Sequence, residues 1–189
     1  MAGAVATQIP GYTVGTWKID QAHSDVSFTV RHLMVSKVRG NFRSFEGTLV
    51  TAEDPQNSSV TATIQLDSID TNQEQRNAHI RSADFFEVEK YPVMTYRSTG
   101  VRPDGHDWIV DGELTLKGVT KQVPLKLELN GFGPDAYGGT RAGFTAKAEI
   151  NRSDFGVSWN ANLDGGGVVI SEKVQILLEI EAVLDKDAE

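Results

Sequence analysis

The sequence contains no cysteine among its 189 residues. It therefore forms no disulfide and offers no thiolate to a metal, and cysteine usage gives no indication of the redox compartment. Basic residues are also scarce: 18 Lys and Arg stand against 26 Asp and Glu, for a formal net charge of −8. This balance argues against a nucleic-acid-binding protein, which normally carries a basic face. It also argues against electrostatic attachment to anionic membranes.

Long apolar runs are missing as well. No stretch approaches the roughly 20 apolar residues of a membrane-spanning helix, so we predict no transmembrane segment. The N-terminal region has no basic side chain before Lys18 and lacks the apolar stretch, roughly 7–15 residues long, of a secretory signal. The sequence as given predicts a cytoplasmic protein, although a mature form whose signal had been removed would look the same.

The motifs of common catalytic sites are absent. There is no G-x-S-x-G nucleophile elbow, and the glycine run at 165–167 lacks the lysine and the following helix of a phosphate-binding loop. No pair of carboxylates stands out for acid–base catalysis. None of the four histidines has a partner at metal-binding spacing; they are His23, His32, His79 and His106. We therefore predict no enzymatic activity, no cofactor and no metal site.

The sequence is dominated instead by an alternation of apolar and polar side chains. About eight runs show this period of two, at residues 26–32, 38–50, 60–67, 93–101, 108–117, 123–130, 142–150 and 174–182. Strands with one apolar face are typical of antiparallel sheets, and this number favours a closed barrel or a two-sheet sandwich. Phe42 and Phe45 are three residues apart, so we expect a bulge near Arg43 and Ser44. The predicted fold class is all-β.

One segment departs from the alternation. Residues 73–83 favour a short helix, and Thr71 followed by Glu74 has the spacing of a capping box. A second helical turn is expected to begin at Asp84 and to end before Tyr91, because Pro92 disfavours helix in the residue before it. Residues 1–16 are expected to form a flexible extension, and residues 17–185 a single domain.

The inside of an eight-stranded barrel is either filled by side chains or holds one small ligand. Alternation alone does not separate these cases, although small inward residues such as Gly112 and Ala146 favour a cavity slightly. His32 is the best candidate for contact with a polar head group, and a core histidine bonded to backbone explains it equally well. The strand residues expected to line a cavity are Phe28, Val30, His32, Phe42, Phe45, Ile64, Leu66, Tyr96, Trp108, Leu114, Leu116, Phe144 and Leu178.

Several motifs together resemble the YceI-like family of polyisoprenoid-binding proteins, which have a lipocalin-like barrel. They include WKIDQAHSDVSFTVRHL at 17–33, VRGNFRSFEG at 38–47, SIDTNQEQRNAHIRSADFFEVEKYP at 68–92, DGELTLKGVTKQVPL at 111–125 and GFTAKAEINRSDFGVSWN at 143–160. The resemblance implies an eight-stranded antiparallel barrel without catalytic residues. It implies a long apolar ligand, such as a polyisoprenoid, a quinone precursor or a fatty-acid amide, and homodimers as one expected state. One departure is Asn77, where the family usually has aspartate.

Within such a barrel, we expect the helical insertion to close or border one end. Phe85 and Phe86 would turn toward the interior, and Asp84 would cap the second turn. The rim, near strand ends or a head group, would hold Arg76, His79 and Arg81. His79 and the two phenylalanines thus join the predicted ligand-lining residues.

Two alternatives to a lipid carrier stay open from the sequence. One is an enzyme, a hydrolase or isomerase of an apolar substrate, which would place titratable groups with shifted acidities in the same cavity. The other is a structural or stress-response domain with a filled core.

Overall fold

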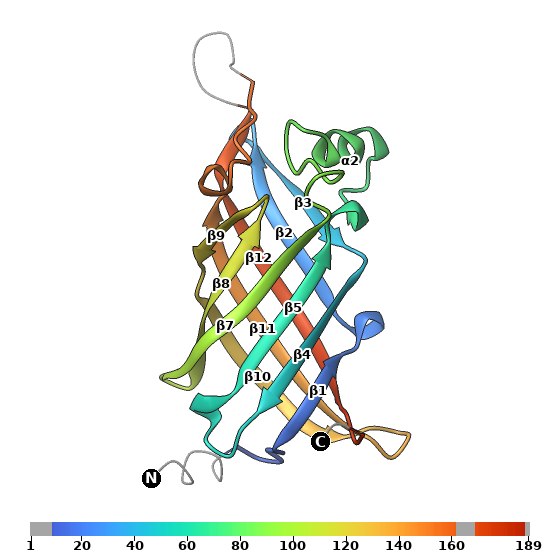
Figure 1. Ribbon diagram of the computed structural model, residues 1–189, viewed down its shortest axis with the longest axis vertical. Coiled ribbons are helices and arrows are strands. Elements are labelled where there is room, and N and C mark those ends of the chain that lie inside the picture. The colour runs from blue at the N-terminus through green and yellow to red at the C-terminus, as the bar shows by residue number, and fades with distance from the viewer. Residues whose placement is uncertain (1–8, 162–168, 188–189) are drawn as a thin grey trace.

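Eight antiparallel strands close into a barrel in the computed structural model, which describes residues 9–161 and 169–187 (Figure 1). The ring closes because its last strand pairs with its first. In ring order the strands are β1 (Gly15–Ile19), β4 (Phe45–Thr51), β5 (Ser59–Gln65), β7 (Val93–Asp104), β8 (Asp107–Leu116), β10 (Leu125–Pro134), β11 (Thr140–Asn151) and β12 (Ile170–Leu184). The predicted all-β, eight-stranded antiparallel barrel is confirmed.

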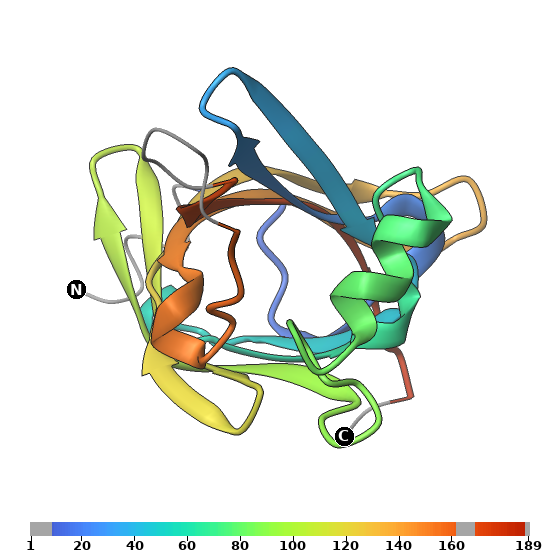
Figure 2. The same ribbon diagram turned by 90° about the horizontal axis from the view of Figure 1, so that it is seen from above.

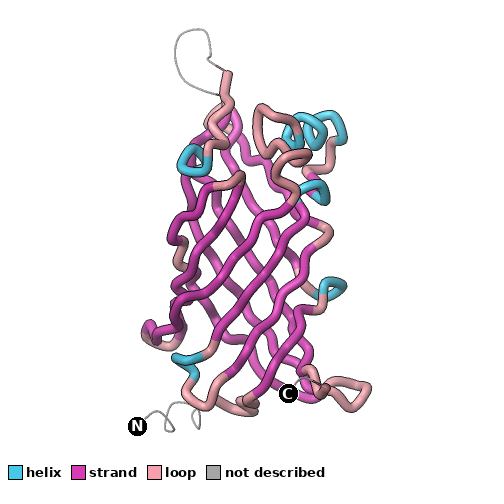
Figure 3. The backbone as a smooth tube through the Cα atoms, viewed as in Figure 1, coloured by secondary structure: helices cyan, strands magenta, loops and turns pink. Residues whose placement is uncertain are grey.

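Three positions of the barrel wall are each occupied by two successive strands instead of one, so the sheet contains more strands than the closed ring of eight. β2 (Asp25–His32), β3 (Ser36–Phe42) and β6 (Ile69–Asp70) continue the wall beyond β1, β4 and β5 at the end that carries the helix. The 3₁₀ turns η1 (Gln21–His23) and η3 (Leu66–Ser68) separate successive strands at two of these positions. A short further strand, β9 (Val119–Gln122), pairs with β8. Figure 3 shows that the helical segments are short and lie at the ends or the outside of the wall.

The predicted bulge near Arg43 and Ser44 is a complete break between two strands. β3 pairs with β2 and β6, whereas β4 pairs with β1 and β5. At the break, the Arg43 amide donates to the Ser68 carbonyl at 3.1 Å, and the Gln65 amide donates to the Ser44 carbonyl at 3.0 Å. The phase slip between Phe42 and Phe45 therefore lets both rings point inward on either side of a corner, and both are buried.

The inner face of the wall is apolar, as the alternation predicted. One of its glycines is required by a close contact: a Cβ on Gly112 would lie 2.4 Å from the Tyr96 hydroxyl. The Tyr96 hydroxyl crosses this position and donates to the Val123 carbonyl at 2.8 Å. Gly112 thus packs under a large neighbour and leaves no space of its own, while Ala62 and Ala146 do face a cavity.

The helical insertion is present but shorter than predicted. The helix α2 spans Glu74–Arg81, and its N-cap is Gln73, whose side chain makes no capping hydrogen bond. The Thr71–Glu74 capping box is therefore wrong. Thr71 instead donates through its amide to Oδ1 of the buried Asn77, at 2.8 Å, and this contact fixes the entry into the helix.

Residues 83–90 form turns and not the predicted second helix. Glu87 has a positive φ of 53°, a conformation that ends a right-handed helix. The remaining 3₁₀ turns are η2 (Pro55–Asn57) and η4 (Arg152–Phe155). Across residues 9–161 and 169–187, none of the helices is long and apolar enough to span a membrane.

Residues 9–16 of the predicted flexible extension, residues 1–16, have a defined place in the fold. Gly15 already belongs to β1, and residues 9–14 cross the end of the barrel opposite α2 (Figures 1 and 2). The Tyr12 ring packs edge-on against Phe132 with centroids 5.4 Å apart, and its hydroxyl donates to the Ala52 carbonyl. This segment is therefore a floor of the barrel; residues 1–8 lie outside the described residues.

Candidate ligand-binding site

The barrel interior is hollow. Two adjoining cavities lie along it: an upper chamber of about 660 Å³, bordered by α2, and a lower chamber of about 220 Å³, bordered by residues 9–14 and η2. Val26, Met94 and Ile176 line both chambers, so these side chains form their junction. Ligand pockets commonly enclose roughly 300–1,000 Å³. The interior has the volume of a binding site and is not filled by its own side chains.

Fifteen of the sixteen predicted lining residues reach one of the two chambers. Those in the upper chamber are Phe28, Val30, His32, Phe42, His79, Phe85, Phe86 and Leu116. Those in the lower chamber are Phe45, Ile64, Tyr96, Trp108, Leu114, Phe144 and Leu178. Leu66 lines neither chamber. It belongs to η3, where the strand alternation ends, and it is fully buried in the wall.

The segment after α2 borders the mouth of the upper chamber. Phe85 is buried, and its ring lies 5.3 Å from that of Trp159. His79 packs edge-on against both rings, at 5.0 Å from Phe85 and 4.7 Å from Trp159. Phe86 reaches further in, 6.2 Å from Phe42. Both phenylalanines turn toward the interior, as expected.

The expected role of Asp84 as a helix cap is wrong. No second helix begins there, and its Oδ2 lies 2.8 Å from Nε2 of His79. The pair is about half exposed at the rim. It joins the last turn of α2 to the loop that carries Phe85, so it holds the loop in place over the chamber.

The arginines are the charged side chains among the described residues that line the upper chamber, so the charge there has one sign. Among its described lining residues there is no aspartate or glutamate. The basic or titratable side chains there are Arg31, His32, Arg76, His79 and Arg152. The lower chamber has only Glu46 as a charged lining residue and is otherwise almost wholly apolar. The interior therefore has a basic end and an apolar end.

Arg152 is the most unusual member of this group, because its side chain is buried. Its guanidinium donates to four backbone carbonyls, those of Val157, Trp159, Ile170 and Ser171, at 2.8–3.3 Å. Burial lowers the pKa of Arg152 from its ordinary value, and no carboxylate within the described part of the chain forms an ion pair with it. A guanidinium has five N–H donors, so one donor is left beyond these four bonds.

Arg76 is held at the mouth by the start of the helical insertion. Its Nε donates to the Thr71 hydroxyl at 2.9 Å, and its Nη2 donates to the Thr71 carbonyl. Asn77 accepts from Thr71 and donates through Nδ2 to Asp70 at 3.3 Å. An aspartate at 77 would place a second carboxylate against Asp70, so asparagine suits this position and keeps the contact. Arg81, also expected at the rim, pairs with Glu74 and does not line the chamber.

The floor of the lower chamber is made by Tyr12 and Phe132, and Phe132 also packs edge-on against Phe144. Tyr96 lies higher in the same chamber, and burial raises the pKa of its hydroxyl well above the ordinary value. Because its hydroxyl donates to the Val123 carbonyl, Tyr96 contributes the surface of its ring to the cavity lining. Such an apolar lining is suited to bind a hydrocarbon chain.

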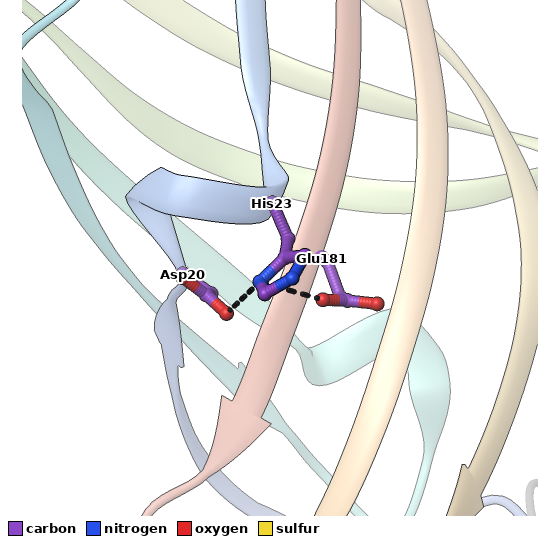
Figure 4. A group of neighbouring side chains, drawn as sticks. All are labelled: Asp20, His23 and Glu181. Carbon is purple, nitrogen blue, oxygen red and sulfur yellow. Dashed lines mark hydrogen bonds and ion pairs between the residues drawn. The ribbon is translucent and has the colours of Figure 1, made fainter. Parts of the chain in front are cut away.

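A separate cluster of charged side chains lies on the outside of the barrel near η1 (Figure 4). His23 Nδ1 is 2.7 Å from Asp20 Oδ2 and 3.6 Å from Glu181 Oε2. Arg141 Nη1 lies 2.8 Å from each of the same two oxygens. Since a guanidinium already neutralises both carboxylates, the cluster is an ion-pair network that ties β11 and β12 to η1, and its donors do not fit a resident cation.

Several lining residues were missed by the sequence analysis. Arg152 and Trp159 lie in the quoted motif at 143–160, but alternation does not extend to them because they follow β11. Met94 lies on a weak run and was not singled out. Tyr12 was missed because a floor built by an N-terminal segment has no local signature. Phe132 was missed because the register of β10 shifts between Leu129 and Gly131, where the predicted run ends.

Known proteins share this architecture. A family model described as a YceI-like domain matches residues 17–182. The protein YceI of Escherichia coli is 42% identical over 173 residues, which cover 90% of this chain and 87% of YceI. The crystal structure of Burkholderia cenocepacia BcnA gives a TM-score of 0.75 at 24% identity, covering 86% of this chain and 98% of BcnA. A polyisoprenoid binding domain from Saccharophagus degradans gives 0.67 at 20% identity, covering 92% and 100% of the two chains. The chain therefore belongs to the YceI-like family.

Proposed function

We propose that this protein binds a long apolar lipid inside the barrel and carries it without chemical change. The observation that carries the proposal is the pair of adjoining chambers, which share Val26, Met94 and Ile176 and continue from the basic mouth to the apolar floor. A ligand with a polar head and a long tail fits this sequence of linings. A polyisoprenoid is the class we favour, because a structural neighbour is described as a polyisoprenoid binding domain.

Burial of the tail supplies the driving force. Each buried CH₂ contributes roughly 0.8 kcal/mol, so a five-carbon isoprene unit gains on the order of 3–4 kcal/mol before costs. Loss of translational and rotational freedom costs roughly 4–15 kcal/mol, so several units must be enclosed before binding becomes tight. The apolar lining discriminates weakly between chain lengths, since each methylene changes the binding free energy by only about 0.8 kcal/mol.

The head group lies at the basic mouth in this proposal. Arg152 lines the upper chamber, carries a buried charge whose guanidinium donates to four backbone carbonyls, and has one N–H donor left. Arg76 and His32 line the same end. An acceptor-bearing or anionic head group, such as a phosphate, a carboxylate or a phenolic or quinone oxygen, would satisfy this donor and reduce the cost of the buried charge.

No catalytic role enters this proposal. His79 and Asp84 resemble the base and orienting group of a catalytic pair, but the ring of His79 packs between Phe85 and Trp159. In the described residues, no serine, threonine or tyrosine hydroxyl is hydrogen-bonded to the imidazole. A nucleophile activated by a neighbouring base requires such a contact.

The test is mass spectrometry of an organic extract of the purified protein. We expect a long-chain lipid in stoichiometric amount from the natural sequence. In Trp108→Glu, which places a charge in the lower chamber, the extract should contain about tenfold less lipid. The matched control is Ile109→Glu, on the next residue of β8, which lines neither chamber and should leave the lipid content unchanged. A folded Trp108→Glu variant that carries as much lipid as the control would refute an interior ligand.

A further inference from the structure

The tip of the β2–β3 hairpin presents apolar side chains to solvent. Leu33, Met34 and Val35 are 38%, 61% and 85% exposed, and they are consecutive in the chain. The other large hydrophobic residues exposed in the described part of the chain are scattered singly. Single exposed apolar residues need no explanation, whereas a contiguous group marks an interaction surface.

The backbone conformation at this tip disfavours the apolar side chains of Leu33 and Met34. Leu33 and Met34 have φ values of 54° and 60°, and the Val35 amide donates to the His32 carbonyl at 3.2 Å. These are the two central residues of a tight hairpin turn with positive φ, for which Asn-Gly is strongly preferred. Side chains of leucine and methionine are sterically disfavoured there. The sequence thus keeps leucine and methionine at positions where local sterics disfavour them, and Met34 and Val35 stay mostly exposed, so packing within the chain compensates little.

Cations surround the same tip. Arg31 and Lys37 are directly opposite each other in the hairpin, and Arg39 follows two residues along on the same face; all three are exposed. None of them forms an ion pair within residues 9–161 and 169–187. Glu172 is close in the neighbouring strand but does not pair with them. A protein of net charge −8 therefore carries a local positive patch here.

The hairpin projects from the barrel wall beside the upper mouth, as the view along the axis shows (Figure 2). The Leu33 amide donates to the Val169 carbonyl at 2.8 Å, and Val169, Arg31 and His32 all line the upper chamber. The apolar tip and the chamber therefore open on the same side of the molecule.

We propose that this tip, Leu33–Met34–Val35 with Arg31, Lys37 and Arg39, docks on the surface of an anionic lipid bilayer. The apolar side chains would enter the interface between head groups and acyl chains, while the three cations meet anionic head groups. The overall negative charge opposes this only weakly, because charges beyond a Debye length of about 10 Å are screened at 0.1 M salt. A second copy of the chain is a poorer occupant, since a two-fold contact would bring the same three cations together.

Docking would turn the upper mouth toward the membrane. Membrane docking is argued from the hairpin tip and does not depend on a ligand in the barrel. Exchange of lipid between bilayer and chamber rests on the proposed function.

Flotation of the purified full chain with vesicles tests the proposal. We expect binding to phosphatidylcholine vesicles that contain about one quarter phosphatidylglycerol, weaker binding to pure phosphatidylcholine, and a decrease with rising salt. The decisive variant is the double substitution Leu33→Asn with Met34→Gly. It introduces the pair that the turn prefers, so its thermal midpoint should rise, while vesicle binding should fall by about tenfold. Lys37→Glu with Arg39→Glu should abolish the preference for anionic vesicles.

The matched control is Tyr137→Ser, which removes a 92% exposed aromatic from the turn between β10 and β11 and should leave binding unchanged. This turn lies at the end of the barrel opposite α2 (Figure 1). Absence of vesicle binding, or equal binding by the Asn-Gly variant, overturns the proposal. A dimer in sedimentation velocity that the Asn-Gly variant loses would assign the tip to a second copy instead. Organic extracts of the same preparations test the chamber separately. Lipid in the extract without vesicle binding would refute membrane docking and leave the proposed carrier function intact. Vesicle binding with no lipid in the extract would refute the carrier function and leave docking intact.

Discussion

His79 Nε2 lies 2.8 Å from Asp84 Oδ2, and this contact joins the end of α2 to the loop that places Phe85 and Phe86 over the upper chamber. The two residues are five apart in sequence, on either side of the turn that follows the helix. The pair is partly exposed, so its contribution to global stability is small, about 0–1 kcal/mol. Its importance lies in where the loop is held.

Removal of this contact is expected to speed ligand exchange. In Asp84→Ala, release of a fluorescent lipid analogue to acceptor vesicles should accelerate by up to about fivefold, which corresponds to the upper value of about 1 kcal/mol for a partly exposed pair. The urea midpoint should change little. Glu74→Ala is the control, because it removes the other ion pair of α2, with Arg81, outside the chamber. Equal release rates in Asp84→Ala and the natural sequence would show that this loop does not limit exchange.

The junction between the chambers should set the length of bound chain. Met94→Trp adds bulk between Val26 and Ile176, so mass spectra of co-purified lipid should shift to shorter chains. Overpacking of this kind costs about 1–3 kcal/mol of stability, so the variant should still fold. Met94→Leu conserves volume and should retain the natural distribution. An unchanged distribution in Met94→Trp would mean that the tail does not pass the junction.

Arg152 is expected to be the most sensitive polar residue. Arg152→Leu leaves four carbonyls without their donor, and we expect a loss of about 3 kcal/mol or more in the free energy of unfolding. Arg152→Lys keeps the charge but cannot reach four carbonyls with one ammonium, so it should lose an intermediate amount. Urea unfolding monitored by tryptophan fluorescence measures both.

Arg102→Leu provides the comparison for Arg152. It removes an exposed guanidinium that pairs with Asp111 on the outer face, and its cost in the free energy of unfolding should be much smaller than that of Arg152→Leu. Should Arg152→Leu cost no more than Arg102→Leu, the four carbonyls would have found other donors, and the buried charge would serve the ligand alone.

Acid should weaken the protein partly through the ion-pair network near η1. The hydrogen bond from Arg141, and after it that from His23, lowers the pKa of Asp20 to about 2. An unfolded aspartate titrates near 3.9. Because the folded pKa is the lower one, Asp20 stabilises the fold above about pH 4, and this stabilisation is lost as the pH falls toward about 2.

The measurement for this network is the urea midpoint as a function of pH. Asp20→Asn should be less stable than the natural sequence at pH 6, and most of this difference should be lost by about pH 2. Asp25→Asn removes a neighbouring exposed carboxylate that forms no ion pair within the described residues and should leave the pH profile unchanged. A parallel loss for both variants at every pH would exclude a titrating contribution from Asp20.

The strands and their inner faces could be predicted because burial on one side imposes a period of two. That rule placed Phe28, Trp108 and Leu178 inside the barrel. It failed at Leu66, where the strand gives way to a 3₁₀ turn and the phase no longer has meaning. It also could not choose between a bulge and a break at Arg43, because both shift the phase and differ only in which distant strand pairs next.

The polar part of the site was harder to predict. Thr71 had the spacing of a capping residue, yet Asn77 competes for its amide, and that competition depends on the fold. Arg152 carried no distinguishing signal, since nothing in the sequence shows that four carbonyls converge on it. Charges are placed by tertiary contacts, whereas apolar side chains are placed by the strand they belong to.

The last strand has a consequence for how the protein is made. β12 pairs with β11 along one edge and with β2 and then β1 along the other, including the pairing of Trp17 with Leu184. The ring therefore cannot close during synthesis until the C-terminal residues have left the ribosome. Until then the nascent chain forms an open sheet with an exposed apolar face and unpaired edge strands. Intermediates of this kind aggregate or bind chaperones. Truncation that removes Ala182–Leu184 would open the seam of the barrel and leave β1 paired with β4 alone.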